Sequence, residues 1–195
     1  MTALWTLALL SITEPRAVAE RLMALRLGHE AILLAFGVVV VLNAVFFAAT
    51  LMIAPMDGPL QPALSNPVIF MLLLGGSLGV AAIALTWTGR AMGGEARLED
   101  MGLLLIWLQG LRVVLQAASM ILITVSSLLA AVVAMAGSVI GVWILVNFVS
   151  AAHGFDSLAK ATLVLVLGLI GMALGLTVFL SLIGATTRLG LNEYV

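Results

Sequence analysis

Five long apolar runs dominate this sequence, and each can form a helix long enough to cross a membrane. They cover residues 31–54, 67–88, 101–125, 128–151 and 161–187. A helix needs about 20 apolar residues to cross roughly 30 Å of hydrocarbon. Only Ser126 and Ser127 interrupt the apolar stretch between the third and fourth runs, so these helices need a tight turn. The runs predict an all-α fold, a polytopic membrane helix bundle with five transmembrane helices.

The composition agrees with a chain whose surface faces lipid. Apolar residues make up 64% of the 195 residues and charged residues only 9%. A soluble domain is about half apolar and about a quarter charged. The net charge of −1 provides no field that would attract nucleic acid. The absence of cysteine excludes disulfides, thiolate metal sites and cysteine nucleophiles.

The chain divides into three predicted parts: an N-terminal cytoplasmic segment at 1–30, the membrane domain at 31–187 and a short external tail at 188–195. Residues 1–12 are apolar, but no basic residue precedes them and no small-residue cleavage site follows. We therefore do not interpret them as a signal peptide.

The second half of the N-terminal segment has the pattern of an amphipathic helix. Thr13 is a suitable cap for a helix whose first turn contains Pro15. Val18, Leu22 and Leu25 then share one face at helical spacing. We expect an interfacial helix that lies on the membrane surface. The alternative is a solvated helix packed on the protein's own loops.

The basic residues predict the orientation. With the N-terminus in the cytoplasm, six of the seven Lys and Arg residues outside the apolar runs are cytoplasmic. Cytoplasmic loops carry an excess of basic residues. We therefore expect a cytoplasmic N-terminus and an external C-terminus. The richness in Ala, Leu, Val and Gly is typical of a GC-rich bacterial genome, which would place the protein in a bacterial inner membrane.

Acidic residues and histidines lie outside the five runs. All nine Asp and Glu residues are in loops or termini, and His29 and His153 are at the predicted cytoplasmic border. Proton-coupled carriers need carboxylates at depth. We interpret His153 and Asp156 as part of a capped turn in a solvated loop. The sequence therefore predicts no catalytic, cofactor-binding or metal site.

One charge lies within a run. Arg112 is about halfway along the third run, where it costs at least about 2.5–3.5 kcal/mol on insertion scales. It forms a polar stripe with Gln109, Gln116 and Ser119, and Asn43 in the first run is the expected hydrogen-bond partner of this stripe. Arg112 could meet a carboxylate of another subunit or an anionic lipid or substrate. Alternatively, glutamines and helix carbonyls of the same chain satisfy it, or its side chain snorkels toward a membrane interface.

Glycines occur in pairs that favour close helix packing. The small-xxx-small pairs are Gly75 with Gly79, Gly137 with Gly141, and Gly171 with Gly175, with Gly168 extending the last. Such pairs allow helix backbones to approach closely, within the chain or between chains. The glycines at 89–94 are interpreted as a turn into the next helix, because no strand precedes them and no Lys-Ser pair follows.

Several short motifs occur in a familiar order along nearly the whole chain. They are the Pro15-bearing helix, Gly89-Arg90, Gly93-Gly94 with Leu98, Glu99 and Asp100, the stretch 143–148, His153-Gly154-Phe155 and Lys160. This order resembles the Yip1-domain family, in its bacterial branch. The resemblance implies five spans, an external C-terminus and interaction rather than catalysis. Eukaryotic members contact small GTPases through a long N-terminal region that this sequence lacks.

The leading hypothesis is a non-catalytic membrane protein that acts as a scaffold, assembly factor or accessory subunit. It would contact lipid and other integral membrane proteins, or a second copy of itself, and no nucleic acid. The alternative is a transporter or lipid-handling protein that uses Arg112 to recognise an anionic group. That alternative predicts a polar groove beside Gln109, Arg112 and Gln116. An enzyme would need His153, Asp156, Glu99 and Asp100 to converge around a metal.

Overall fold

The computed structural model describes the backbone of residues 2–53 and 65–190, and the side chains of residues 4–53 and 65–174. This part of the chain is all-α and contains no strand, which confirms the predicted fold class. Its helices are α1 (Thr2–Thr13), α2 (Pro15–Ala24), α3 (His29–Ile53), α5 (Pro67–Ala91), α6 (Leu98–Ile123), α7 (Ser127–His153) and α8 (Leu158–Gly190). The final residues of the predicted tail, 191–195, lie outside the described part.

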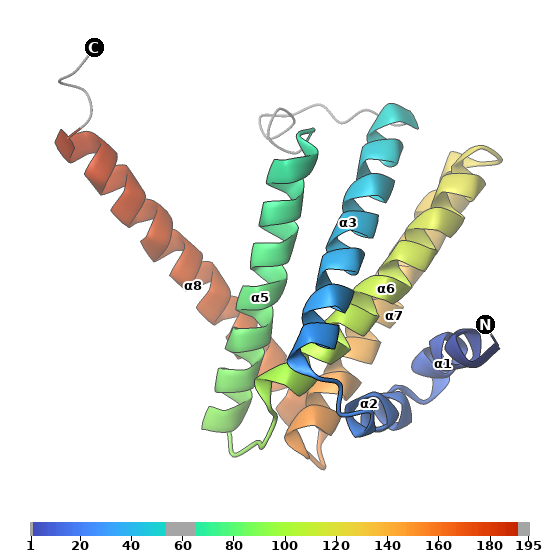
Figure 1. Cartoon of the computed structure of the whole chain (residues 1–195), viewed down its shortest axis with the longest axis horizontal. Helices are drawn as coiled ribbons and strands as arrows, with labels where there is room; N and C mark the ends of the chain where they lie inside the picture. Colours follow the sequence, from blue (N-terminus) through green and yellow to red (C-terminus); the bar gives the residue numbers. More distant parts are fainter. Residues whose placement is uncertain (1, 54–64, 191–195) are drawn as a thin grey trace.

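The long helices form a bundle, with α6 and α7 as an antiparallel hairpin (Figure 1). Helices α3, α5, α6 and α7 are each long and apolar enough to cross a membrane. The described apolar part of α8, Leu158–Leu174, is shorter than these four helices. Several spans are therefore present, and the count of five stays a prediction.

Local sequence sets the ends of these helices. Asn66 caps α5 because its side-chain oxygen accepts hydrogen bonds from the backbone N–H groups of Val68 (2.9 Å) and Ile69 (3.3 Å). Ser126 caps α7 by accepting from Leu129 N–H at 3.3 Å. This confirms the turn predicted between the third and fourth runs. Gly154 ends α7 with φ 67°, a left-handed conformation that glycine adopts without strain.

Helix α2 forms where the amphipathic helix was predicted, but its beginning and its surroundings differ. Thr13 ends α1 instead of capping α2, and the capping residue, Glu14, makes no side-chain cap bond. Val18 is 0% exposed and packs with Leu104 of α6 and Phe148 of α7. Val18 and Leu22 are therefore covered by the chain's own helices, whereas Leu25, the third residue of the predicted apolar face, is 60% exposed.

Helix α1, which we did not predict, precedes α2 and contacts the bundle through Ser11. Ser11 is buried, donates to Leu7 O at 2.8 Å and accepts from the indole N–H of Trp107 in α6 at 3.0 Å. Trp5 and Leu9 of α1 remain exposed. This helix thus leaves part of its apolar surface for lipid.

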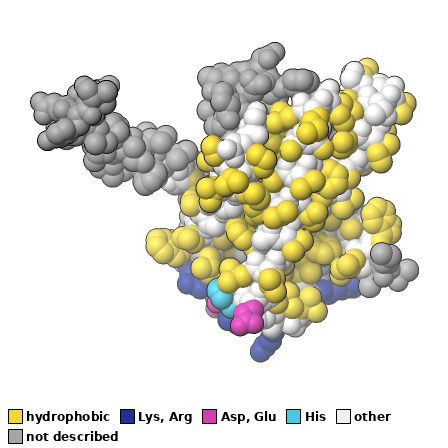
Figure 2. Space-filling view, turned by 45° about the horizontal axis from the view of Figure 1, so that its top comes forward, with side chains coloured by type: hydrophobic (Ala, Val, Ile, Leu, Met, Phe, Trp, Pro, Cys, Tyr) yellow, Lys and Arg dark blue, Asp and Glu magenta, His cyan; other side chains and the backbone are white. Residues whose placement is uncertain are grey.

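The polar and apolar surfaces separate along the bundle. The end formed by α2, the α5–α6 turn and the α7–α8 turn is called the α2 end below (Figure 1). Hydrophobic side chains spread over the helices, and the charged side chains visible on that face gather near one end (Figure 2). Two buried apolar clusters, built on α2, α5, α6, α7 and α8, hold the helices together. A lipid-facing belt above a charged end is the surface of a multi-pass membrane protein.

Candidate functional site

His153 lies at the α2 end and is buried, with 2% of its surface exposed. The backbone N–H of Ala96 donates to its Nδ1 at 3.4 Å, and its Nε2 lies 3.2 Å from Leu85 O. Because Nδ1 accepts, Nε2 carries the proton and donates to Leu85 O. The imidazole thus connects α5, the α5–α6 turn and α7. The prediction of a solvated loop is wrong for His153, whose partners come from residues remote in sequence.

The glycines of the α5–α6 turn make room for this imidazole. A Cβ built on Gly89 or on Gly94 would overlap the His153 side chain. The backbone N–H of Glu95 also donates to His153 O at 3.3 Å. Gly93 has φ 81°, so the segment is a turn into α6 as predicted. Its glycines serve helix packing around a buried side chain.

The α7–α8 turn is fixed by contacts to Phe155. Its carbonyl oxygen accepts from Arg16 Nη1 of α2 at 3.1 Å and from Ser150 Oγ at 2.9 Å. Lys160 Nζ lies 4.5 Å from the centre of the Phe155 ring, a cation–π contact. Among the described residues, no three His, Asp or Glu side chains lie close enough together to hold a metal ion. The contacts at the α2 end therefore hold α2, α7 and the α7–α8 turn together.

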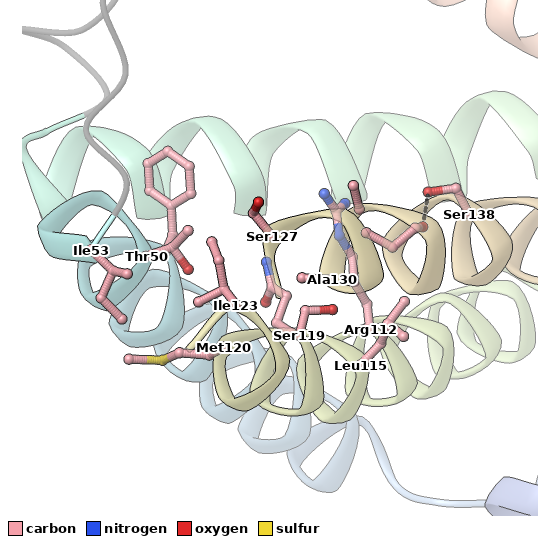
Figure 3. A pocket seen from close by; sticks show the side chains of 14 residues that line it. Thr50, Ile53, Arg112, Leu115, Ser119, Met120, Ile123, Ser127, Ala130 and Ser138 are labelled. Carbon is pink, nitrogen blue, oxygen red and sulfur yellow. Dashed lines mark hydrogen bonds between the residues drawn. The ribbon is translucent and has the colours of Figure 1, made fainter. Parts of the chain in front are cut away.

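The polar stripe of α6 does not lie at the α2 end but toward the α6–α7 turn. A pocket with a volume of about 420 Å³ opens between α3, α6 and α7, and Arg112, Gln116 and Ser119 line it. Figure 3 shows Arg112 extending from α6 toward α7, with Ser127 at the start of α7. Gln109 belongs to the stripe but does not line the pocket. The pocket therefore lies beside Arg112 and Gln116, but not beside all three residues that the alternative hypothesis named.

Several polar groups of the stripe have no partner in the described part of the chain. Gln109 Oε1, Gln116 Oε1 and Ser119 Oγ are buried without a hydrogen bond. The guanidinium of Arg112 has neither a hydrogen bond nor an ion pair there. Asn43 is buried on α3, but its amide nitrogen donates to Val39 O at 2.8 Å within its own helix. The described hydrogen bond of Asn43 thus stays within α3, and its contact with the stripe stays a prediction.

The predicted glycine pairs split into inward and outward members. A Cβ on Gly137 would overlap Leu115, and one on Gly75 would touch Phe36 at 3.4 Å. Gly168 similarly faces Leu85 at 3.1 Å. The other three described members, Gly79, Gly141 and Gly171, have nothing within 4 Å of an added Cβ. The surroundings of Gly175 lie outside the described residues.

Fold and site together define a class: a multi-pass helical membrane protein with a pocket between its membrane helices that is lined by both polar and apolar side chains. The Yip1 domain model matches residues 9–179. Since this match covers most of the chain, the protein belongs to the Yip1 family, as its short motifs predicted. Searches of curated proteins and of solved structures found no match.

Proposed function

We propose that this Yip1 family protein is a non-catalytic membrane protein that binds an anionic amphiphile in the pocket between α3, α6 and α7. One observation carries the proposal: Arg112 lines this pocket without a counter-charge from the described part of its own chain. Arg112 is eleven residues before the end of α6, or roughly 16 Å at 1.5 Å per residue. A guanidinium at this depth needs an anion to offset its desolvation.

A second feature of the pocket favours an anion. Ser127, the first residue of α7, lines the pocket, so the N-terminus of a 27-residue helix lies at its edge. The unpaired N–H groups of a helix N-terminus carry partial positive charge and attract anions. Apolar side chains such as Leu115 and Met120 also line the pocket. The pocket therefore combines positive charge with apolar walls, which suits an anionic amphiphile.

Replacing Arg112 by leucine tests this proposal. We expect wild-type protein, extracted in mild detergent, to retain an anionic lipid in native mass spectrometry. Arg112→Leu should reduce that retention about tenfold or more, since a charge-assisted contact contributes about 1.5–3 kcal/mol. Arg21→Leu removes the same charge from α2 and is the matched control. Equal lipid retention in wild type and Arg112→Leu would refute lipid binding at this pocket.

A scaffold role is the second candidate, and the outward glycines favour it. Gly79, Gly141 and Gly171 leave shallow places on α5, α7 and α8 where another helix can approach closely. The partner would be another integral membrane protein or a second copy. Co-purification of a membrane protein that Arg112→Leu releases, with no bound lipid, would favour this role over lipid binding.

The proposed location is a bacterial inner membrane, with the α2 end in the cytoplasm. The cysteine-free chain allows a direct test with single cysteines. Val125, 77% exposed in the α6–α7 turn, and Ser157, exposed in the α7–α8 turn, lie at opposite ends of the bundle. An impermeant maleimide should label Val125→Cys on intact cells and Ser157→Cys only after lysis. The opposite pattern would reverse the orientation.

A further inference from the structure

Two buried polar atoms of the pocket lack a hydrogen-bond partner, as a comparison with the other hydroxyl groups of this protein shows. Helical serines and threonines here usually donate to a carbonyl of their own helix: Ser11, Thr50, Thr86, Ser138 and Thr162 each do so at 2.7–2.9 Å. Ser119 does not, although its Oγ is buried. The buried Oε1 of Gln116, one turn earlier on the same face, also lacks a donor. Both residues line the Arg112 pocket.

Such buried, unpaired atoms are costly unless a ligand satisfies them. An ionised carboxylate or phosphodiester cannot do this, because its oxygens only accept hydrogen bonds. Gln116 Oε1 is an acceptor and requires a donor. A ligand that carries donors in addition to the negative charge that Arg112 attracts would pair both groups at once.

The charge of the pocket restricts the kind of donor. An ammonium group would donate to Gln116, but it would place a second positive charge beside Arg112, and no Asp or Glu of the described residues lines the pocket. Like charges at short range repel strongly in a low-dielectric site. Hydroxyl groups both donate and accept without charge, so they can also match Ser119. Hydroxyls are therefore the donors that suit this pocket.

We infer that the pocket recognises a polyol phosphate ester, with the phosphate at Arg112 and its free hydroxyls at Gln116 and Ser119. This inference rests on the proposed function and specifies its ligand. Gln116 and Ser119 follow Arg112 by four and seven residues on α6, which is roughly 6 and 10 Å along the helix. The volume of about 420 Å³ can hold a glycerol phosphate headgroup.

A lipid competition experiment tests this ligand. The full-length protein in detergent is given equal amounts of phosphatidylglycerol, phosphatidic acid, phosphatidylserine and phosphatidylethanolamine with identical acyl chains, and bound lipid is counted by native mass spectrometry. We expect phosphatidylglycerol to exceed each of the others about tenfold, because they lack neutral hydroxyl donors or add an ammonium group.

Variants separate recognition of hydroxyls from recognition of charge. The double substitution Gln116→Leu with Ser119→Ala should bind phosphatidylglycerol and phosphatidic acid equally, whereas Arg112→Leu should lose both. Ser77→Ala on α5 is the matched control, because the Ser77 hydroxyl does not line the pocket and already donates to Leu74 O at 2.8 Å. Its lipid preference should equal that of wild type. Near-ultraviolet circular dichroism checks that each variant is folded.

The outcomes distinguish the inference from the proposed function. Equal, Arg112-dependent binding of phosphatidylglycerol and phosphatidic acid by wild type would overturn the inference and leave the proposed function standing. Absence of all four lipids would overturn both. Adding soluble glycerol 1-phosphate in excess identifies the source of the ligand. Resistance of bound phosphatidylglycerol to displacement supports a lipid ligand, and displacement supports a soluble polyol phosphate recognised by the same groups.

Discussion

Gly89→Ala is expected to destabilise the protein by about 2 kcal/mol, although alanine normally stabilises a helix relative to glycine by about 1 kcal/mol. The added Cβ would overlap the imidazole of His153. This imidazole cannot turn aside cheaply, because both of its nitrogens are held by backbone groups, Ala96 N–H and Leu85 O. The midpoint of unfolding in mixed micelles, followed by tryptophan fluorescence, measures the effect.

Two matched variants make this prediction specific. Gly79→Ala lies on the same helix with nothing within 4 Å of the added Cβ, so it should be neutral or stabilising. His153→Ala removes the side chain that Gly89 accommodates, and the cost of Gly89→Ala should nearly vanish in that background. Equal effects of Gly89→Ala with and without His153 would show that the imidazole does not fill this space.

Ala134→Trp is expected to reduce anionic lipid binding about tenfold or more while leaving the fold intact. Ala134 lines the pocket from α7 and is exposed, so an indole there would occupy the space proposed for the ligand without entering a packed core. Steric exclusion differs from the loss of charge in Arg112→Leu, because it should affect every lipid to the same degree. Native mass spectrometry with the four lipids above measures the loss.

The adjacent residue provides the control for this variant. Met135 is 67% exposed on the same helix but does not line the pocket. Met135→Trp adds the same indole to a different face and should bind lipid as wild type does. If both tryptophan variants lose lipid equally, the effect comes from the surface of α7 in general. The pocket would then not be the binding site.

The pattern of side chains along the chain was sufficient to predict α2 and the long helices, but not α1. A run of about 20 apolar residues has one stable form in lipid, because every backbone N–H and C=O must be paired within the segment. The turn at Ser126 and Ser127 was also predictable, since a serine cap is a local interaction. The family likewise followed from short local motifs, which the Yip1 domain match bears out.

What packs against each helix face was harder to predict from the sequence. The apolar stripe of α2 correctly predicted a helix, but periodicity alone cannot tell a lipid-facing stripe from a protein-facing one. Val18 meets Leu104 and Phe148, whose positions depend on how α6 and α7 pack. Glycine pairs have the same ambiguity, and the structure turns Gly137 inward and Gly141 outward. Spacing predicts that two residues share a face, but not what covers it.

By itself, the sequence determined the all-α membrane fold and the unusual position of Arg112, because the cost of a charge in lipid depends on depth along one helix. Only the tertiary structure decided that His153 is buried between Gly89 and Gly94, and that Arg112 lines a pocket. Both results depend on residues far apart in the chain that become neighbours when α3, α5, α6 and α7 pack. Local propensity contains no information about such long-range contacts, so the pocket could be recognised only after the helices were assembled.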